Sequence, residues 1–267
     1  MRTRHVFTLM TGLMLGWAVS AAVGAAGGDD KTCEKSKACP KAGKLLKGIV
    51  HLTDNDVRFQ TKDKKTIFVD PMSGPGDSLV VSLGKMKPDL ILITHPHGDH
   101  LNLDVLKAYV KVNPEVIVAG PADAVRVAKE KGFDSMRTVE MNKAAKLAGV
   151  EFETVPAYFT EGDHHPKASG WAGYVLRVNG NRYYVTGDTG PTEEAAKLKA
   201  DVIFPLLWGC GGNAEGAVKL AAISNASLIV PVHHGGSKDA LVKLSAMLPK
   251  GLCRAVYLNG KLTQMPE

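Results

Sequence analysis

A short apolar run followed by a cluster of histidines is the most constraining feature of this chain. The run Leu90–Thr94 is rich in β-branched residues and lies between Pro88-Asp89 and Gly98, which predicts a buried strand. Directly after it, residues 95–100 read HPHGDH and hold three of the chain's nine histidines. Loops at the carboxyl ends of strands often carry the functional groups of layered α/β folds. The chain is therefore expected to be an α/β protein with a functional loop at this position.

The residue types in this loop indicate a metal site. Neutral imidazole and carboxylate groups are ligands that Zn²⁺ and its neighbours prefer. Pro96 stiffens the loop, and Gly98 lets it turn sharply so that side chains can converge. A solvated polar loop is the alternative, but three histidines and one aspartate in six residues argue against it. The candidate ligands are His95, His97, Asp99 and His100.

The first residues predict an export signal. A basic start at Met1–Arg4 is followed by an apolar, uncharged stretch over residues 6–19 and by small residues up to Ala26. This order is typical of a secretory signal peptide over residues 1–26. An uncleaved membrane anchor is the alternative, because the apolar stretch approaches the length of a membrane span. A bacterial periplasmic or secreted protein, without membrane insertion after cleavage, is the expectation.

The remaining chain predicts one layered domain behind a short linker. Residues 27–46 are lysine-rich and predict a flexible basic lead-in, and residues 47–267 are long enough to form one domain. The chain carries 33 Lys and Arg against 27 Asp and Glu, a formal net charge of +6. This modest excess comes without an arginine-rich patch or interleaved aromatic residues, which argues against a nucleic-acid partner. A small-molecule substrate is the expected partner.

Strand and helix patterns alternate along this domain. Strands are predicted over residues 48–52, 56–60, 66–69, 90–94, 116–118, 150–155, 173–178, 182–186, 202–207, 228–232 and 254–258. Helices are predicted over residues 103–112, 122–131, 191–199, 214–224 and 238–248. Asn179-Gly180 predicts a hairpin turn. The mixture indicates packed sheets with helices outside them.

The four cysteines are Cys33, Cys39, Cys210 and Cys253. In an oxidising compartment an even number favours disulfides, and the expected pairs are Cys33–Cys39 and Cys210–Cys253, although three pairings are possible. A thiolate metal site is the alternative. It is less favoured because the sequence has no C-x-x-C motif and no cysteine close to a histidine.

Three later stretches offer further metal ligands at or beside predicted strand ends. They contain His164-His165, Gly187-Asp188-Thr189 and His233-His234. With the HPHGDH window, this order resembles the metallo-β-lactamase superfamily of metal-dependent hydrolases. The resemblance implies a four-layered αββα sandwich. It extends to a bacterial subgroup that includes ascorbate-6-phosphate lactonase-like enzymes, whose motifs correspond here to His165-Pro166-Lys167, Gly170-Trp171-Ala172-Gly173-Tyr174, Gly187-Asp188-Thr189 and Pro231-Val232-His233-His234-Gly235.

The resemblance implies two divalent metal ions, zinc in the first place, with manganese or iron as alternatives. Residues His95, His97 and His165 would hold one ion, residues Asp99, His100 and His233 would hold the other, and Asp188 would bridge them. Successive residues on an extended chain point to opposite sides, so one residue of each His-His pair would be a direct ligand. The family motif favours His165 over His164 and His233 over His234. Asp99 and Asp188 would be the catalytic residues.

The implied activity is hydrolysis by a hydroxide that bridges the two metals, at an ester, lactone, amide or phosphodiester bond. A non-catalytic metal-binding protein and an iron-dependent redox member of the superfamily are the alternatives. Asp70 and Thr189 are expected partners of the histidine ligands. The segments Asp54-Asn55-Asp56 and Gly209–Ala214 depart from the family pattern, so the sequence does not define the substrate or the oligomeric state.

Overall fold

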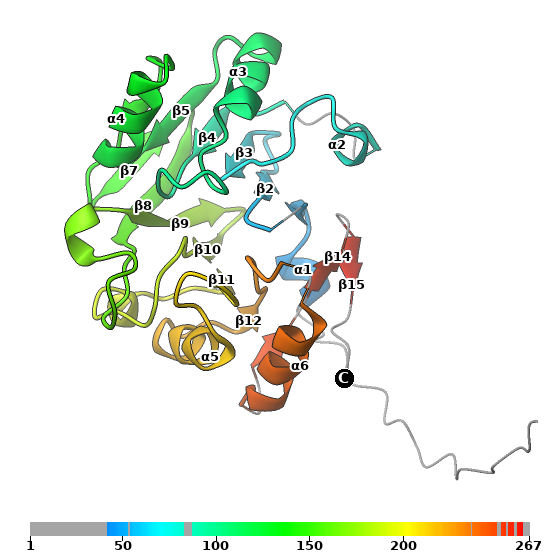
Figure 1. Ribbon diagram of the computed structural model, residues 1–267. Coiled ribbons are helices and arrows are strands. Elements are labelled where there is room, and N and C mark those ends of the chain that lie inside the picture. The colour runs from blue at the N-terminus through cyan, green and yellow to red at the C-terminus, as the bar shows by residue number, and fades with distance from the viewer. Residues whose placement is uncertain are drawn as a thin grey trace, which may run out of the picture. The chain divides into compact units, whose positions relative to one another are not determined.

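The computed structural model describes residues 42–52, 54–82, 87–235, 237–249, 252–254, 256–258 and 261–263. The predicted signal peptide, most of the lead-in, and Cys33 and Cys39 lie outside these residues. The described strands form two main sheets with helices on their outer faces (Figure 1). Within this part of the chain, every helix is too short or too polar to cross a membrane.

The first sheet has six strands in sequence order. They are β1 (Ile49–His51), β2 (Val57–Gln60), β3 (Thr66–Val69), β4 (Leu90–Leu92), β5 (Ile117–Gly120) and β6 (Arg137–Thr138). The strands β1, β2 and β3 pair antiparallel, whereas β3 through β6 pair parallel. The helices of this half are α1 (Ala42–Leu45), α2 (Ser78–Ser82), α3 (Leu103–Val112) and α4 (Ala122–Glu130). Asn102 caps α3, because its side chain accepts a hydrogen bond from the Val105 amide.

The second sheet has seven strands in the order β13-β12-β11-β10-β9-β8-β7. They are β7 (Ala144–Leu147), β8 (Val150–Pro156), β9 (Ala172–Val178), β10 (Asn181–Val185), β11 (Val202–Phe204), β12 (Leu228–Ile229) and β13 (Cys253–Arg254). The strands β10 through β13 pair parallel. The helices of this half are α5 (Ala214–Ile223) and α6 (Lys238–Met247), with a 3₁₀ turn η1 at Lys167–Ser169. A separate hairpin pairs β14 (Val256–Leu258) with β15 (Lys261–Thr263).

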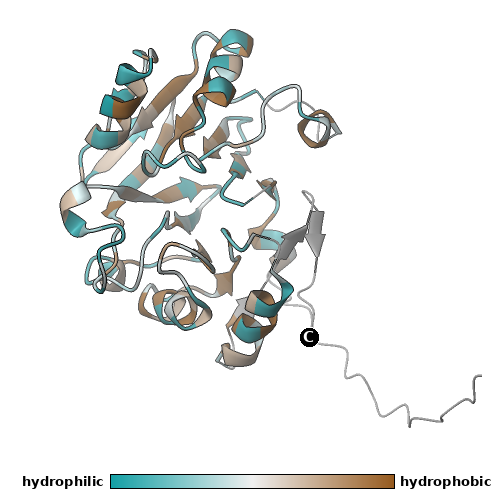
Figure 2. Ribbon diagram, in the orientation of Figure 1, coloured by the Kyte–Doolittle hydropathy of each residue, from teal (hydrophilic) through white to brown (hydrophobic). Residues whose placement is uncertain are grey.

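Alternation along the central strands creates three hydrophobic layers. In β4, Leu90 and Leu92 pack between the sheets, while Ile91 packs with residues of α3 and α4. In β11, Phe204 faces the same inter-sheet core and Ile203 packs with α5 and α6. Figure 2 shows mostly hydrophobic central strands and helices of mixed colour, as amphipathic helices require. This arrangement confirms the predicted four-layered αββα sandwich.

Several predicted elements differ from the structure. The predicted helix over residues 191–199 is wrong, since only a 3₁₀ turn η2 (Ala195–Lys197) forms there. Few side chains of this segment are buried, chiefly Thr192 and Ala195, so packing does not favour a longer helix. The predicted last strand over residues 254–258 is divided between β13 and β14.

The folded domain also includes residues that the sequence assigned to the lead-in. Leu46 is buried in the inter-sheet core, and Ala42 and Leu45 pack against it. The Tyr183 hydroxyl donates a hydrogen bond of 2.7 Å to the Leu45 carbonyl. Burial and this bond fix residues 42–46 on the sandwich.

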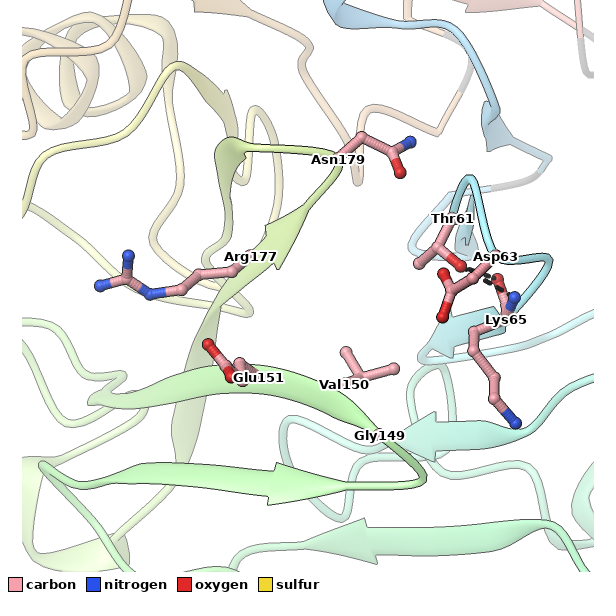
Figure 3. A pocket seen from close by; sticks show the side chains of 8 residues that line it. All are labelled: Thr61, Asp63, Lys65, Gly149, Val150, Glu151, Arg177 and Asn179. Atoms are coloured by element: carbon pink, nitrogen blue, oxygen red, sulfur yellow. Dashed lines mark hydrogen bonds between the residues drawn. The ribbon is translucent and has the colours of Figure 1, made fainter.

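The predicted hairpin turn at Asn179-Gly180 lies at the end of the sandwich where β3 and β8 begin. Asn179 has a φ of 55°, as a primed hairpin turn requires, and its side chain accepts a 2.7 Å hydrogen bond from the Lys62 amide. The turn of the second sheet is thereby tied to the β2–β3 turn of the first. Figure 3 shows the polar cavity of about 270 Å³ at this end, which is lined by Thr61, Asp63, Lys65, Gly149, Val150, Glu151, Arg177 and Asn179.

Candidate metal centre

The predicted ligands meet at the opposite end of the sandwich, where β3, β4, β10 and β12 end. Asp188 lies at the centre of the group. Its Oδ1 atom is 3.3 Å from His100 Nε2, and its Oδ2 atom is 3.7 Å from both His165 Nε2 and His233 Nε2. The same Oδ2 atom is 3.9 Å from His95 Nε2. One carboxylate therefore faces four imidazoles that come from three separate loops.

The ligand atoms form overlapping groups of the size that a metal ion needs. Within each group, the ligand atoms lie within 4.8 Å of one another. The groups are His95-His97-His165, His95-His100-Asp188, Asp99-His100-His233 and His165-Asp188-Cys210. The structure thus brings together all seven predicted ligands and adds a cysteine that the sequence analysis did not assign to the site.

The hydrogen bonding of the site fits a cation. His165 is 3% exposed and Asp188 is 2% exposed. Among the described residues, neither ring nitrogen of His165 has a hydrogen-bond partner, and neither has the Oδ2 atom of Asp188. Burying polar atoms without partners costs about 1–3 kcal/mol each. A cation bound between these atoms would compensate that cost.

Asp70 orients one of the predicted ligands. Its Oδ2 atom accepts a 2.7 Å hydrogen bond from His100 Nδ1 and a 2.6 Å bond from the Thr94 hydroxyl. Its Oδ1 atom accepts from the Thr94 amide at 2.8 Å. This bond fixes a proton on Nδ1, so the Nε2 atom of His100 faces the site. The predicted role of Thr189 is wrong, because its hydroxyl bonds to backbone atoms of Tyr158 and Gly190.

The electrostatics of the ligands follow from burial and from the three carboxylates. Burial lowers the pKa of His100, but the Asp70 and Asp188 carboxylates outweigh it and raise the pKa to about 10. The hydrogen bond from His233 lowers the pKa of Asp99 to about 2. Burial lowers the pKa of His165 to about 4, so this imidazole is neutral at pH 7 and its lone pair is available.

Asp70 and two of the predicted ligands have left-handed backbone conformations. The φ angles are 47° at Asp70, 53° at His165 and 52° at His233. Non-glycine residues rarely adopt this region, and such strain costs on the order of 1–3 kcal/mol per residue. The surrounding fold therefore imposes the directions in which these side chains leave the loops.

In each His-His pair, one histidine lies in the site and the other lies outside it. His165 is buried beside Asp188, whereas His164 is exposed. His233 Nε2 lies 3.0 Å from Asp99 Oδ2, whereas the ring of His234 lies 6.3 Å from the ring of His51. The geometry therefore supports the choice of His165 and His233.

Trp171 and its neighbours position the histidines. The indole ring contacts the rings of His95, His97 and His165 at centroid distances of 4.9, 4.9 and 4.6 Å. Its Nε1 atom donates a 3.0 Å hydrogen bond to Asp123. From the next strand, the Tyr174 hydroxyl donates to the Ile93 carbonyl at 2.6 Å, which links the two sheets beside the site.

Sequence reasoning missed the role of Asn55. This buried side chain donates to the Asp99 carbonyl at 3.0 Å and lies 3.0 Å from His100 Nε2. It belongs to the segment that departs from the family pattern. No local motif indicates the contact, because Asn55 is 44 residues from Asp99 along the chain.

The predicted Cys210–Cys253 disulfide is wrong, since Cys210 is a free cysteine. Cys253 pairs with Leu228, the first residue of β12, whereas Cys210 follows the carboxyl end of the neighbouring strand β11. The two cysteines therefore lie toward opposite ends of the parallel strands in the second sheet. Burial and the Asp188 and Asp99 carboxylates raise the pKa of Cys210 to about 11.

Comparison with known proteins identifies the family. Residues 65–234 match the family described as the Beta-lactamase superfamily domain. This match spans more than half of the chain, so the protein belongs to the β-lactamase superfamily. A UPF0173 protein of Pyrococcus furiosus is 30% identical over 189 residues, which cover 68% of this chain and 81% of the relative.

Two further comparisons agree with this assignment. A UPF0173 metal-dependent hydrolase of Thermococcus onnurineus is 25% identical over 184 residues, which cover 66% of this chain and 80% of the relative. The crystal structure of a candidate metal-dependent hydrolase from Parabacteroides distasonis has a TM-score of 0.65 at 23% identity. The match covers 78% of this chain and 91% of that chain, and it shows that the fold is shared.

The contrast between His164 and His165 gives a testable expectation. His165→Gln should lower metal content clearly, because it removes a buried ring nitrogen that faces Asp188. His164→Gln in the exposed neighbour should leave metal content near that of the unmodified protein. Elemental analysis of the two purified variants compares them directly. Metal loss in the His164 variant alone would show that the wrong member of the pair was chosen.

The Asp70–His100 hydrogen bond gives a second expectation. Asp70→Asn should weaken metal binding roughly 10–100-fold, the usual effect of removing a partner that orients a histidine ligand. Competition with a chromophoric chelator measures the affinity. Asp89→Asn is a matched control, since Asp89 bonds to Lys65 and the Thr66 amide at the start of β3, away from the site. Equal affinities in the two variants would contradict this role of Asp70.

Proposed function

We propose that this protein is a dinuclear metal-dependent hydrolase that acts on an ester, lactone, amide or phosphodiester bond of a small molecule. The observation that carries the proposal is the position of Asp188 between two sets of ligand atoms. The first set is His95, His97 and His165, and the second is Asp99, His100 and His233. Membership of the superfamily and the names of relatives as metal-dependent hydrolases support it.

Two bound divalent cations would activate water and polarise the bond to be cleaved. The chain's residues supply the rest. Asp188 is buried and would hold both ions at a fixed spacing, while Asp70 keeps His100 in the correct orientation. Asp99 is the most exposed carboxylate of the site, with 48% side-chain exposure, so its free oxygen can accept a hydrogen bond from water.

A cavity next to the ligands fits a small-molecule substrate. Its volume is about 520 Å³, within the usual range for such sites. Thr189 and Gly211, the chain neighbours of Asp188 and Cys210, lie in its wall. Phe159 also lines it, and the Phe159 ring lies 5.9 Å from the His165 ring. The cavity walls are of mixed polar and apolar character, and Glu161, Glu215 and Lys219 are charged groups available for substrate recognition.

The test is metal quantification followed by a hydrolase substrate panel. The purified protein should hold two metal ions per chain, zinc before manganese or iron, and chelation should abolish turnover of chromogenic esters, lactones, amides or phosphodiesters. Binding of metal without turnover of any substrate would favour a non-catalytic metal-binding protein. A content of iron with redox activity would favour the redox alternative.

We further propose that the protein belongs to the lactonase-like bacterial subgroup and is exported to the periplasm or secreted. The motifs at residues 165–167, 170–174, 187–189 and 231–235 support the first proposal, and the signal-like composition of residues 1–26 supports the second. N-terminal sequencing of the natively expressed protein should find a start near Ala26 or Gly27. An intact Met1 on a membrane-bound product would support the anchor alternative.

A further inference from the structure

Cys210 occupies an unusual position in a tight hairpin turn. Gly209 and Gly212 form a bridge, and the Gly212 amide donates a 2.7 Å hydrogen bond to the Gly209 carbonyl. The two residues between them, Cys210 and Gly211, have φ angles of 48° and 92°, as in a type I′ turn. Asparagine, aspartate or glycine is preferred at the first of these positions. The turn therefore holds a cysteine where another residue would be less strained.

The Cys210 side chain lies among buried groups that lack partners. Its sulfur and the ligand atoms of His165 and Asp188 lie within 4.8 Å of one another. Within the described part of the chain, both ring nitrogens of His165 and the Asp188 Oδ2 atom have no hydrogen-bond partner. These unpartnered atoms indicate a bound cation without reference to Cys210. The Cys210 sulfur lies within 4.8 Å of the His165 and Asp188 ligand atoms, so it can bind the same cation.

We propose that Cys210 Sγ is a further ligand of the metal ion held by His165 and Asp188. The inference rests on the proposed metal site but goes beyond its histidine and aspartate ligands. Binding breaks the S–H bond, transfers the proton to solvent and forms a sulfur–metal bond, with no change in oxidation state. A soft thiolate favours zinc over manganese, so Cys210 would set the metal preference of this ion.

Cobalt substitution of the full chain tests the proposal. Cobalt bound by thiolate has a charge-transfer band in the near ultraviolet, which histidine and carboxylate ligands do not produce. The cobalt-loaded protein should show this band, and Cys210→Ser and Cys210→Gly should both lose it. Glycine suits the positive φ, so Cys210→Gly keeps the turn unstrained if the serine variant folds poorly. The matched controls Cys253→Ser and Cys33→Ser/Cys39→Ser should retain the band.

Metal affinity and proton release provide two further measurements. Loss of a direct ligand should weaken zinc binding at least about tenfold, as much as loss of an outer hydrogen-bond partner does. Manganese affinity should change less, so the zinc-to-manganese preference should fall in Cys210→Ser. Zinc titration in weak buffer should release one proton fewer from Cys210→Ser than from the unmodified chain.

The outcomes separate this inference from the proposed function. If the protein binds two cobalt ions but the thiolate band is absent or survives both Cys210 variants, Cys210 is not a ligand and the dinuclear site still stands. If the protein binds a single cobalt ion and the band disappears with Cys210, the cysteine ligand stands and the dinuclear proposal is wrong.

Discussion

Asp188→Ala should reduce metal content from two ions to one or none per chain and abolish hydrolysis. Asp188 is the carboxylate that faces imidazoles of both ligand sets. Two unit charges 4 Å apart repel by about 4 kcal/mol in a partly buried site, and two divalent ions repel about four times as strongly. Without the negative charge between them, one ion should be expelled. Elemental analysis and turnover of the best panel substrate measure the two effects.

Two variants sharpen this test. Asp188→Asn keeps the size of the side chain but removes its charge, so it should also lose metal if charge is the cause. Asp163→Ala changes an exposed carboxylate in the loop that carries His165 and should retain both ions and activity. Retention of two ions in Asp188→Ala would show that Asp188 does not bridge them.

Asp56→Ala should be the most destabilising single substitution outside the metal centre. Asp56 and Arg58 are 0% and 1% exposed and form two hydrogen bonds of 2.8 Å each. Asp56 also accepts hydrogen bonds from the Met72 and Ser73 amides. Removing one partner of a buried pair leaves an uncompensated charge and costs about 3–5 kcal/mol. Urea denaturation of the metal-free protein should show this loss in the free energy of unfolding.

A double variant and a surface pair serve as controls. Asp56→Ala/Arg58→Met removes both charges, so it should destabilise the protein less than Asp56→Ala alone. Glu140→Ala breaks an exposed ion pair with Lys143 and should change stability by less than about 1 kcal/mol. An equally small effect of Asp56→Ala would mean that the buried pair does not stabilise the β1–β2 region.

The site could be predicted from the sequence where its ligands belong to local motifs. His95, His97, Asp99 and His100 share one window, and the strand run before them fixes where that window lies. Asp188 follows a strand whose alternating side chains fill two cores. Such signals depend on neighbouring residues only, so one sequence was enough to recognise them and the layered fold.

The missed residues reach the site through tertiary structure. Cys210 is 22 positions after Asp188, and its turn approaches the ligands only because β11 lies next to β10 in the second sheet. The cysteine count in the sequence favoured disulfides, but parallel pairing keeps Cys210 and Cys253 at opposite strand ends. The wrong helix prediction over residues 191–199 has a related cause. The composition of this segment favours a helix, but the segment has too few buried side chains for packing to stabilise one.

The left-handed backbone at His165 and His233 has a consequence for engineering. Glycine at either position would relieve the backbone strain, so selection for stability of the metal-free fold alone would favour losing these side chains. Metal binding and the stability of the metal-free fold therefore oppose each other at these two positions. Mutant libraries designed to make this enzyme more heat-resistant should keep both histidines constant. They should vary the turns at the end of the sandwich opposite the metal centre.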